Sequence, residues 1–576
     1  MIEVRALHAL RKLHIPTYVA ERYLLESSIC TTFESWAERT FPRKFNSRRP
    51  PRYRTSHQFK GFDANDEPTY REFAVPSPTT ALAEAAILQH LGSEAAFSKN
   101  SNVYSYLWPT VGRSRFNYVP YRIGHELRNS KIRDAAAENR RHQLLILDIS
   151  RFYPSINQRH LMERFHARLA TCHLPTEIST CANQLVEHTC IDNPERREIA
   201  TGPQLSHALA DLALEGLDST LSAMRDSKYF RYVDDIVVVA PPGELQSRQA
   251  QIESILADEG LALNSDKTDV LSANEWLDHG PAAHTRVQAD SFESLVFKIK
   301  VYLARQPDRL HELEARLSEQ EFAIPLGRLV AESRAHGFQS RLLSLLRAGW
   351  DVARRARSAG MNEILDSALA ARTKLIDSIA RQLGHEIPQG ATRRKWHLQK
   401  TRYLVNRAVY LLPHADLDAI AAALESIPEL RENVALLRVL AGNELDDLLL
   451  FPGPAIAAAA GALSQSSRLA SCTYSEVTDR RAWIESIETL AMFGVLEEPR
   501  AATPPEPTAT EQTWINFATG APTPARVSPD FNYEDEIQAL HVGKSAADAK
   551  HALESRYSED EITVFDALEI GDGYAS

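Results

Sequence analysis

The chain has 576 residues, of which 44% are hydrophobic and 24% charged, a composition typical of a globular protein with several domains. Its formal net charge of −11 excludes a surface that is basic throughout, so a nucleic-acid partner would have to bind a local basic region. Five scattered cysteines argue against a disulfide framework and favour a reducing cytoplasm. We find no signal peptide and no apolar run of membrane-spanning length, so we expect a cytoplasmic protein without a membrane partner.

Pattern and composition divide the chain into five segments. These are an N-terminal helical and basic segment, two segments of mixed pattern, a helical segment, and a linker with an acidic tail, over residues 1–64, 65–140, 141–300, 301–498 and 499–576. The linker is rich in Pro, Thr and Ala. Acidic tails are usually solvated and repel nucleic acid, so we expect no packed structure in the last segment.

The first segment ends in a dense basic stretch. Seven basic residues alternate there with aromatic residues and prolines: Arg39, Arg43, Lys44, Arg48, Arg49, Arg52 and Arg54, with Phe41, Phe45 and Tyr53. Basic side chains neutralise phosphates and aromatic rings stack on bases, so we predict that Arg48, Arg49 and Arg52 bind nucleic acid. The alternative is a solvated basic loop that neutralises nearby acidic groups.

Residues 65–140 have the Ala/Leu periodicity of helices, and residues 144–149 read as a buried strand. This strand, Leu-Leu-Ile-Leu-Asp-Ile, is interrupted by the single carboxylate of Asp148. A lone Asp inside an apolar strand is costly unless it is paired or ligates a metal.

Two adjacent carboxylates lie between β-prone runs at Tyr232-Val233-Asp234-Asp235. The pattern predicts a hairpin with the acidic pair at or beside its tight turn. Neighbouring carboxylates repel each other unless a cation lies between them, and hard divalent cations prefer oxygen ligands. An acidic turn that points into water is the alternative, but a third acid at Asp148 favours a two-metal phosphoryl-transfer site.

Four segments resemble, in order, the palm motifs of reverse transcriptases. Asp148 with Tyr153 resembles the A motif, residues 201–218 the B motif, residues 232–235 the C motif, and residues 260–268 with Lys267 the D motif. Upstream, Arg71-Glu-Phe-Ala-Val-Pro76 resembles a fingers segment. The resemblance implies an α+β protein with fingers (65–140) and a palm built on an antiparallel sheet (141–300), followed by an all-α HEAT-like domain.

The resemblance also implies the catalytic groups. Asp148, Asp234 and Asp235, with the backbone carbonyl of Ile149, would hold two Mg²⁺ ions, for which Mn²⁺ is an alternative. Lys267 would protonate the departing pyrophosphate as a general acid.

Four further residues are implied to contact the nucleotide. Arg71 would contact the triphosphate, and the Tyr153 ring would lie under the sugar and exclude a 2′-hydroxyl. Gly202 would let the backbone approach a ligand closely, and Ser206 would cap the helix that follows. Ala200 and Thr201 stand where the commonest family form has Pro-Gln, which resembles the phage-defence, abortive-infection branch of bacterial reverse transcriptases.

Beyond residue 300 the sequence predicts successive Leu/Ala helices in an α-solenoid or HEAT-like stack without a strict repeat. We expect helices at residues 309–317, 340–356, 363–383, 401–412, 416–424 and 434–450. The strongest basic-aromatic cluster in this half is Arg393, Arg394, Lys395 and Trp396, which we predict to bind the product strand or a structural RNA. A solvated helix face is the alternative.

The sequence therefore predicts an RNA-directed DNA polymerase, with antiviral defence implied by the resemblance. Its partners would be deoxynucleoside triphosphates, an RNA template or non-coding RNA, and the DNA product; a partner defence protein and a homo-oligomer are left open. One alternative is a template-independent or protein-primed DNA polymerase of the same fold. The other is a catalytically silent scaffold that binds RNA.

Overall fold

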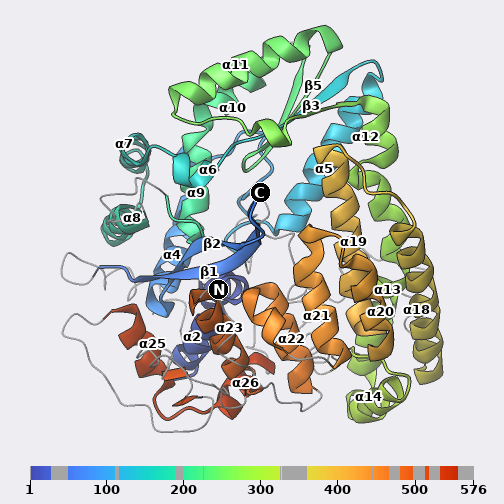
Figure 1. Cartoon of the computed structure of the whole chain (residues 1–576). Helices are drawn as coiled ribbons and strands as arrows, with labels where there is room; N and C mark the ends of the chain where they lie inside the picture. The colour runs from blue at the N-terminus through green and yellow to red at the C-terminus, as the bar shows by residue number, and fades with distance from the viewer. Residues whose placement is uncertain are drawn as a thin grey trace.

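In the computed structural model the described residues are 2–27, 50–109, 116–189, 199–224, 226–324, 326, 360–442, 445–465, 480–496, 513–514, 516–517 and 532–554. Figure 1 shows a sheet-containing part and a large helical part that lie against each other. The expected α+β class with a following all-α domain is confirmed. No helix in the described ranges is long and apolar enough to cross a membrane.

The centre of the first part is a four-stranded antiparallel sheet in the order β4-β5-β3-β6. Its strands are β3 (Gln143–Asp148), β4 (Lys228–Tyr232), β5 (Asp235–Ala240) and β6 (Asp269–Ser272). Residues 236–239 of β5 are Ile-Val-Val-Val and all are buried, because β-branched side chains suit a strand covered on both faces. Helix α5 (Tyr121–Glu138) packs against β4 and β5, and α11 (Leu245–Asp258) packs against β3 (Figure 1).

Six further helices of this part connect or flank the strands and position the motif segments. They are α6 (Phe152–Ser155), α7 (Gln158–Leu169), α8 (Thr176–Thr189), α9 (Gln204–Ala213), α10 (Glu215–Ser222) and α12 (Ala273–His279). Helix α12 begins with a capping box in which Ser272 and Glu275 satisfy each other's backbone N–H groups.

A long hairpin of β1 (Tyr53–Phe62) and β2 (Pro68–Pro76) lies beside this sheet and was not predicted. The sequence pattern predicts a basic loop and helical fingers in this region, because strands made largely of polar residues lack the alternation of apolar and polar residues that identifies a strand. Helices α1 (Ile2–Leu13), α2 (Ile15–Ser27) and α4 (Pro78–Leu91) pack together next to the hairpin. The B-motif backbone reaches β2, where the Ala74 N–H donates to the Thr201 carbonyl (2.8 Å).

The helical part contains most of the predicted helices. Its elements are α13 (Pro281–Arg305), α14 (Leu310–Glu319), α18 (Met361–Leu383), α19 (Ala391–Leu411), α20 (His414–Leu424), α21 (Arg431–Ala441), α22 (Pro454–Gln465) and α23 (Arg480–Met492). Neighbours in sequence pack side by side, notably α18 on α19 and α20 on α21 (Figure 1). The helix expected at residues 340–356 lies outside the described residues, and the HEAT-like repeat stays a prediction.

The last segment differs from the solvated tail that its acidity suggested. Helices α25 (Tyr533–His541) and α26 (Ala546–Glu554) pack on α2, so the last two described helices lie beside an N-terminal one (Figure 1). Tyr533 is buried and its hydroxyl contacts Thr17, while Glu536 pairs with Arg52. The acidic residues here compensate basic residues of the hairpin, which sequence spacing could not reveal.

Replacing Gly202 by Ala should lower the free energy of unfolding by about 1–3 kcal/mol. Gly202 has φ +114°, and a Cβ there would lie 2.8 Å from the Ala74 carbonyl oxygen. Gly216→Ala on exposed α10, where nothing lies within 4 Å, is the matched control and should be neutral or stabilising. Denaturant unfolding of both variants measures the difference, and equal effects would contradict the predicted close packing.

Candidate active site

Three carboxylates converge at one end of the four-stranded sheet. Asp148 is the last residue of β3, and Asp235, the first residue of β5, lies directly opposite it in the register. Asp234 lies in the turn between β4 and β5, and only 3% of Asp148 and 5% of Asp234 is exposed. The structure thus brings together the three acids that the sequence singled out.

The turn that carries Asp234 has an unusual backbone. Tyr232 pairs with Asp235, so Val233 and Asp234 form a two-residue hairpin turn. Val233 has φ +53°, in the left-handed region where glycine is usual and a β-branched residue is an outlier. Such conformations persist only where surrounding contacts stabilise them.

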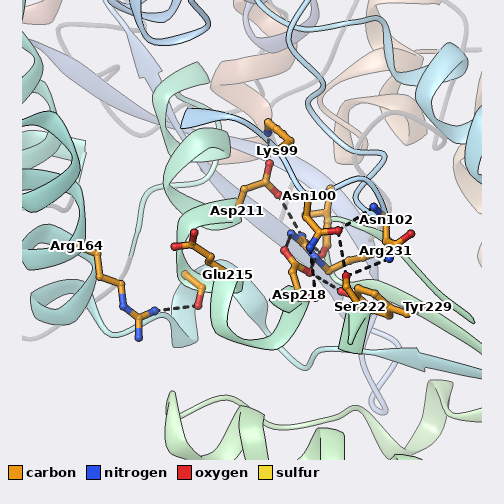
Figure 2. A network of polar contacts seen from close by, with 12 residues as sticks. Lys99, Asn100, Asn102, Arg164, Asp211, Glu215, Asp218, Ser222, Tyr229 and Arg231 are labelled. Carbon is orange, nitrogen blue, oxygen red and sulfur yellow. Dashed lines mark hydrogen bonds and ion pairs between the residues drawn. The ribbon is translucent and has the colours of Figure 1, made fainter. Parts of the chain in front are cut away.

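The stabilising contact comes from Arg231, a fully buried residue two positions earlier (Figure 2). Its Nη1 donates to the Val233 carbonyl (2.8 Å) and to Asp211 Oδ1 (3.1 Å). Its Nε and Nη2 donate to both oxygens of Asp218 (2.7 and 2.6 Å). Because Asp211 lies on α9 and Asp218 on α10, one guanidinium ties the B-motif helices to the catalytic turn.

Cations from three different elements compensate the carboxylates. Lys267 Nζ lies 3.0 Å from Asp148 Oδ1, and Lys395 Nζ of α19 lies 3.6 Å from Asp235 Oδ2. Arg128 of α5 lies 4.0 Å from the same Asp235 oxygen and donates to the Asp235 carbonyl. Within the described part of the chain, the buried Oδ1 of Asp234 has no hydrogen-bond partner.

Burial and these charged neighbours shift the pKa values of the three acids in different directions. Burial, followed by the negative charges of Asp235 and Asp148, raises the pKa of Asp234 to about 7. Burial also raises the pKa of Asp148, although Lys267 opposes the shift. Burial alone would raise the pKa of Asp235 as well. The positive charges around it, chiefly those of Lys395 and Arg128, outweigh burial and lower this pKa. Asp235 is therefore the acid most firmly held as a carboxylate.

A group of positive side chains lies near the acids. Burial and then the charges of Arg71, Lys267 and Arg151 lower the pKa of Lys60, which places four cations close together. Burial lowers the pKa of Arg71, and the nearby Asp234, Tyr106, Tyr153 and Asp148 oppose this shift. Four cations beside three acids form a surrounding suited to a triphosphate and its metal ions.

Tyr153 lies beside this group and is held by α9. Its hydroxyl is 2.8 Å from His207 Nδ1, and the His207 ring stacks on Tyr106 at 3.9 Å between centroids. Burial lowers the pKa of His207 to about 3, so this imidazole is neutral. The contacts fix the Tyr153 ring in one orientation, which a steric selector of sugars requires.

One B-motif expectation needs correction. Ser206 does not cap a helix, because α9 begins at Gln204 after Pro203. It lies within the helix and is fully buried, so it has no surface to offer a nucleotide. Gly202 does permit a close approach, here to the backbone of β2 at Ala74, and its contact with a nucleotide stays a prediction.

The predicted nucleic-acid residues are not gathered into one patch. Arg48 and Arg49 lie outside the described residues, and Arg52 pairs with Glu536. On α19, Arg393 pairs with Glu275 and Arg394 with Glu429, while Trp396 packs edge-on against Trp276. Only Lys395 points to the catalytic acids. The Arg393 pair joins α19 to α12 of the sheet-containing part, whereas Glu429 belongs to the helical part. Because Arg393 and Lys395 stay exposed, a nucleic-acid contact of this cluster remains a prediction.

Sequence reasoning missed four residues of the site: Lys60, Arg128, Arg151 and Arg231. The sequence does contain evidence for Arg231, because a lone charge inside an apolar strand must be paired, and this applies to Arg231 as it does to Asp148. The other three lie on separate elements and come near the acids only through the fold. The Ile149 N–H donates to the Asp234 carbonyl (3.3 Å), and a metal contact of the Ile149 carbonyl stays a prediction.

The donor set fits a hard divalent cation. Asp148 and Asp234 present buried carboxylate oxygens, and the orphaned Oδ1 of Asp234 is a group that a Mg²⁺ or Mn²⁺ ion would satisfy. The charge of Asp235 is already compensated by Lys395 and Arg128, so Asp235 is less suited than Asp148 and Asp234 to bind a metal ion directly.

Residues 97–299 match the family model described as "Reverse transcriptase (RNA-dependent DNA polymerase)". This part of the chain, which contains all three acids, is thus a reverse transcriptase domain. No curated protein matches the chain significantly. Among solved structures, the chain is similar to telomerase from Candida albicans in complex with the TWJ fragment of telomeric RNA, at 13% identity over 70% of each chain. The TM-score of 0.28 is too low to support any further argument.

We expect Arg231→Met to lower the free energy of unfolding by about 3–5 kcal/mol, because it leaves Asp218 buried and unpaired. If Arg231 also stabilises the strained turn, Val233→Gly should recover part of the loss, with a coupling of about 0.5–3 kcal/mol in a double-mutant cycle. Arg164→Met, which breaks a more exposed pair with Glu259, is the control and should cost about 1 kcal/mol or less. Strict additivity of Arg231→Met and Val233→Gly would contradict the role of Arg231 in the turn.

The raised pKa of Asp234 predicts a pH-dependent stability in the absence of metal. A carboxyl whose pKa rises from about 4 in the unfolded chain to about 7 in the fold stabilises the fold fully only below the lower value. That contribution is lost as the pH rises through about 7. Wild-type protein in chelator should therefore lose thermal stability relative to Asp234→Asn between these values. Asp258→Asn, at an exposed position of α11, should follow the wild type; parallel profiles for wild type and Asp234→Asn would refute the shift.

Proposed function

We propose that the protein is an RNA-directed DNA polymerase that transfers nucleotides from deoxynucleoside triphosphates. The observation that carries the proposal is the convergence of Asp148, Asp234 and Asp235 in a segment that matches the reverse transcriptase family. A triphosphate substrate is supported by four neighbouring cations, Lys60, Arg71, Arg151 and Lys267. Positive side chains neutralise the phosphates, and the carboxylates neutralise the two metal ions.

Each group has a role in this proposal. Asp148 and Asp234 would hold two Mg²⁺ ions, which would supply activation of the primer hydroxyl and neutralise charge on the phosphates. Arg71 and Lys60 orient the triphosphate, and Lys267, between Asp148 and the basic group, delivers a proton to the pyrophosphate. Asp235 anchors Arg128 and Lys395 and so keeps α5 and α19 in place beside the catalytic turn.

The helical part would take the position of a thumb and would contact the primer and template. Support comes from α19, which belongs to this part and delivers Lys395 to within 3.6 Å of Asp235. A role in anti-phage defence, in the cytoplasm and with a non-coding RNA, rests on the B-motif departure at Ala200 and Thr201. The HEAT-like repeat, a partner defence protein and self-association belong to the same proposal.

Tyr153 gives the first functional prediction. Tyr153→Ala should raise the use of ribonucleotides by about 10-fold or more, because the ring no longer fills the space of a 2′-hydroxyl. Tyr153→Phe is the matched control, since it removes the hydroxyl with its bonds to His207 and Tyr106 and keeps the ring. Single-nucleotide incorporation with paired deoxy- and ribonucleotides gives the ratio. If Tyr153→Phe used ribonucleotides as readily as Tyr153→Ala, the hydroxyl group and not the bulk of the ring would be responsible for sugar selection.

The experiment that tests the function is sequencing of the nucleic acid that copurifies with the protein from its host cell. An Asp148→Asn/Asp234→Asn variant is prepared alongside, since these changes preserve shape. A defined RNA, with complementary DNA only in the wild-type preparation, is the expected result. DNA without a matching RNA would favour untemplated synthesis, and DNA joined to protein would favour protein priming. Equal RNA and no DNA in both preparations would favour a silent RNA-binding scaffold.

A further inference from the structure

Away from the three acids of the candidate site, three donor atoms converge in the interior between the N-terminal helices and α23. They are Nε2 of His14, between α1 and α2, and one carboxylate oxygen each of Glu485 and Glu488 on α23. The two glutamates are three residues apart on one helix and so share a face. His14 is 7% exposed, Glu485 8% and Glu488 0%.

The distances are long for direct ion pairs and suit a shared ion. His14 Nε2 lies 3.4 Å from Oε2 of Glu485 and 3.4 Å from Oε2 of Glu488. Within the described residues, neither His14 Nε2 nor Glu488 Oε2 has a hydrogen-bond partner, although both are buried. Ligands bound about 2.1 Å from a tetrahedral metal ion lie about 3.4 Å from one another. An ion between these atoms would satisfy both orphaned groups.

Each donor is held from behind, as metal ligands usually are. His14 Nδ1 is 2.8 Å from Thr17 Oγ1, which orients the imidazole. Arg54 of β1 donates to the far oxygens, Oε1 of Glu485 (3.1 Å) and Oε1 of Glu488 (2.9 Å). Ser56 Oγ donates to Glu485 Oε2 (2.8 Å). Arg54 thus occupies Oε1 of both glutamates and leaves Oε2 of each facing the histidine, and Ser56 fixes Oε2 of Glu485 from one side.

The charges of the cluster also balance with a divalent ion. Glu534 of α25 lies 3.8 Å from Arg54 and adds a third carboxylate. Three carboxylates against one guanidinium and one divalent ion sum to zero when the imidazole is neutral. A protonated imidazole in place of the ion would leave one negative charge uncompensated in a largely buried cluster, which is costly.

We propose that His14, Glu485 and Glu488 bind a divalent transition-metal ion of the Zn²⁺ type, whose preference for nitrogen and oxygen ligands at these distances the site meets. The ion joins the N-terminal helices, strand β1 and helix α23, so its role is structural. The site is separate from Asp148, Asp234 and Asp235, and it does not depend on the proposed polymerase activity.

Metal analysis of the untagged full-length protein, dialysed against a weak chelator, tests the proposal. The wild type should retain about one equivalent of a transition metal. His14→Gln and Glu488→Gln should lose it, whereas Glu534→Gln, which removes an acid near Arg54 but no donor atom, should keep it. Asp234→Asn should also keep it, which distinguishes this site from the catalytic one.

Because buried substitutions can prevent folding, Thr17→Val provides a milder variant. It leaves all three donors in place and should weaken Zn²⁺ binding about 10–100-fold. In Co²⁺-reconstituted wild type we expect the visible absorption of a tetrahedral site, and Zn²⁺ added to metal-stripped wild type should raise its thermal midpoint. A wild type that retains no transition metal and gains no stability from added Zn²⁺ would overturn the proposal and leave a protonated His14 as the link between the two glutamates.

Discussion

The repulsion among three carboxylates at one end of a buried sheet is the constraint on which this structure depends. Asp148, Asp234 and Asp235 are held together by backbone pairing, and low dielectric surroundings strengthen their mutual repulsion. The repulsion is reduced by three cations that belong to separate elements of the fold: Lys267, Arg128 and Lys395. Asp235 receives two of these contacts and Asp234 none, so the pKa values of the two adjacent acids are shifted in opposite directions.

The position of Asp234 depends in turn on a strained backbone. A valine in the left-handed region is costly, and it is held there by a guanidinium that is itself locked between Asp211 and Asp218. The network in Figure 2 therefore connects the helix that carries the B motif with the turn that carries the catalytic acids. A movement of α9 would be transmitted to Asp234 through one buried side chain.

Ion pairs also decide how the helical half meets the rest. Arg393 and Lys395 of α19 pair with Glu275 and Asp235 of the sheet-containing part, and the acidic residues of α25 pair with Arg52 and Arg54. Among the described residues, several charges that resemble a nucleic-acid surface in the sequence thus pair with other segments of the chain.

The sequence by itself determined strands β3, β4 and β5, several helices of the second half and the three acids, because each depends on local pattern: β-branched runs, helical periodicity, and a carboxylate inside an apolar strand. It did not determine the β1–β2 hairpin, the burial of Ser206, or the packing of the acidic tail on α2. Nor could it assign Lys60, Arg128 and Lys395 to the acids, or join His14 to Glu485 and Glu488. Those contacts link residues far apart in the chain, and only the tertiary structure decides which charges become neighbours once their elements are packed.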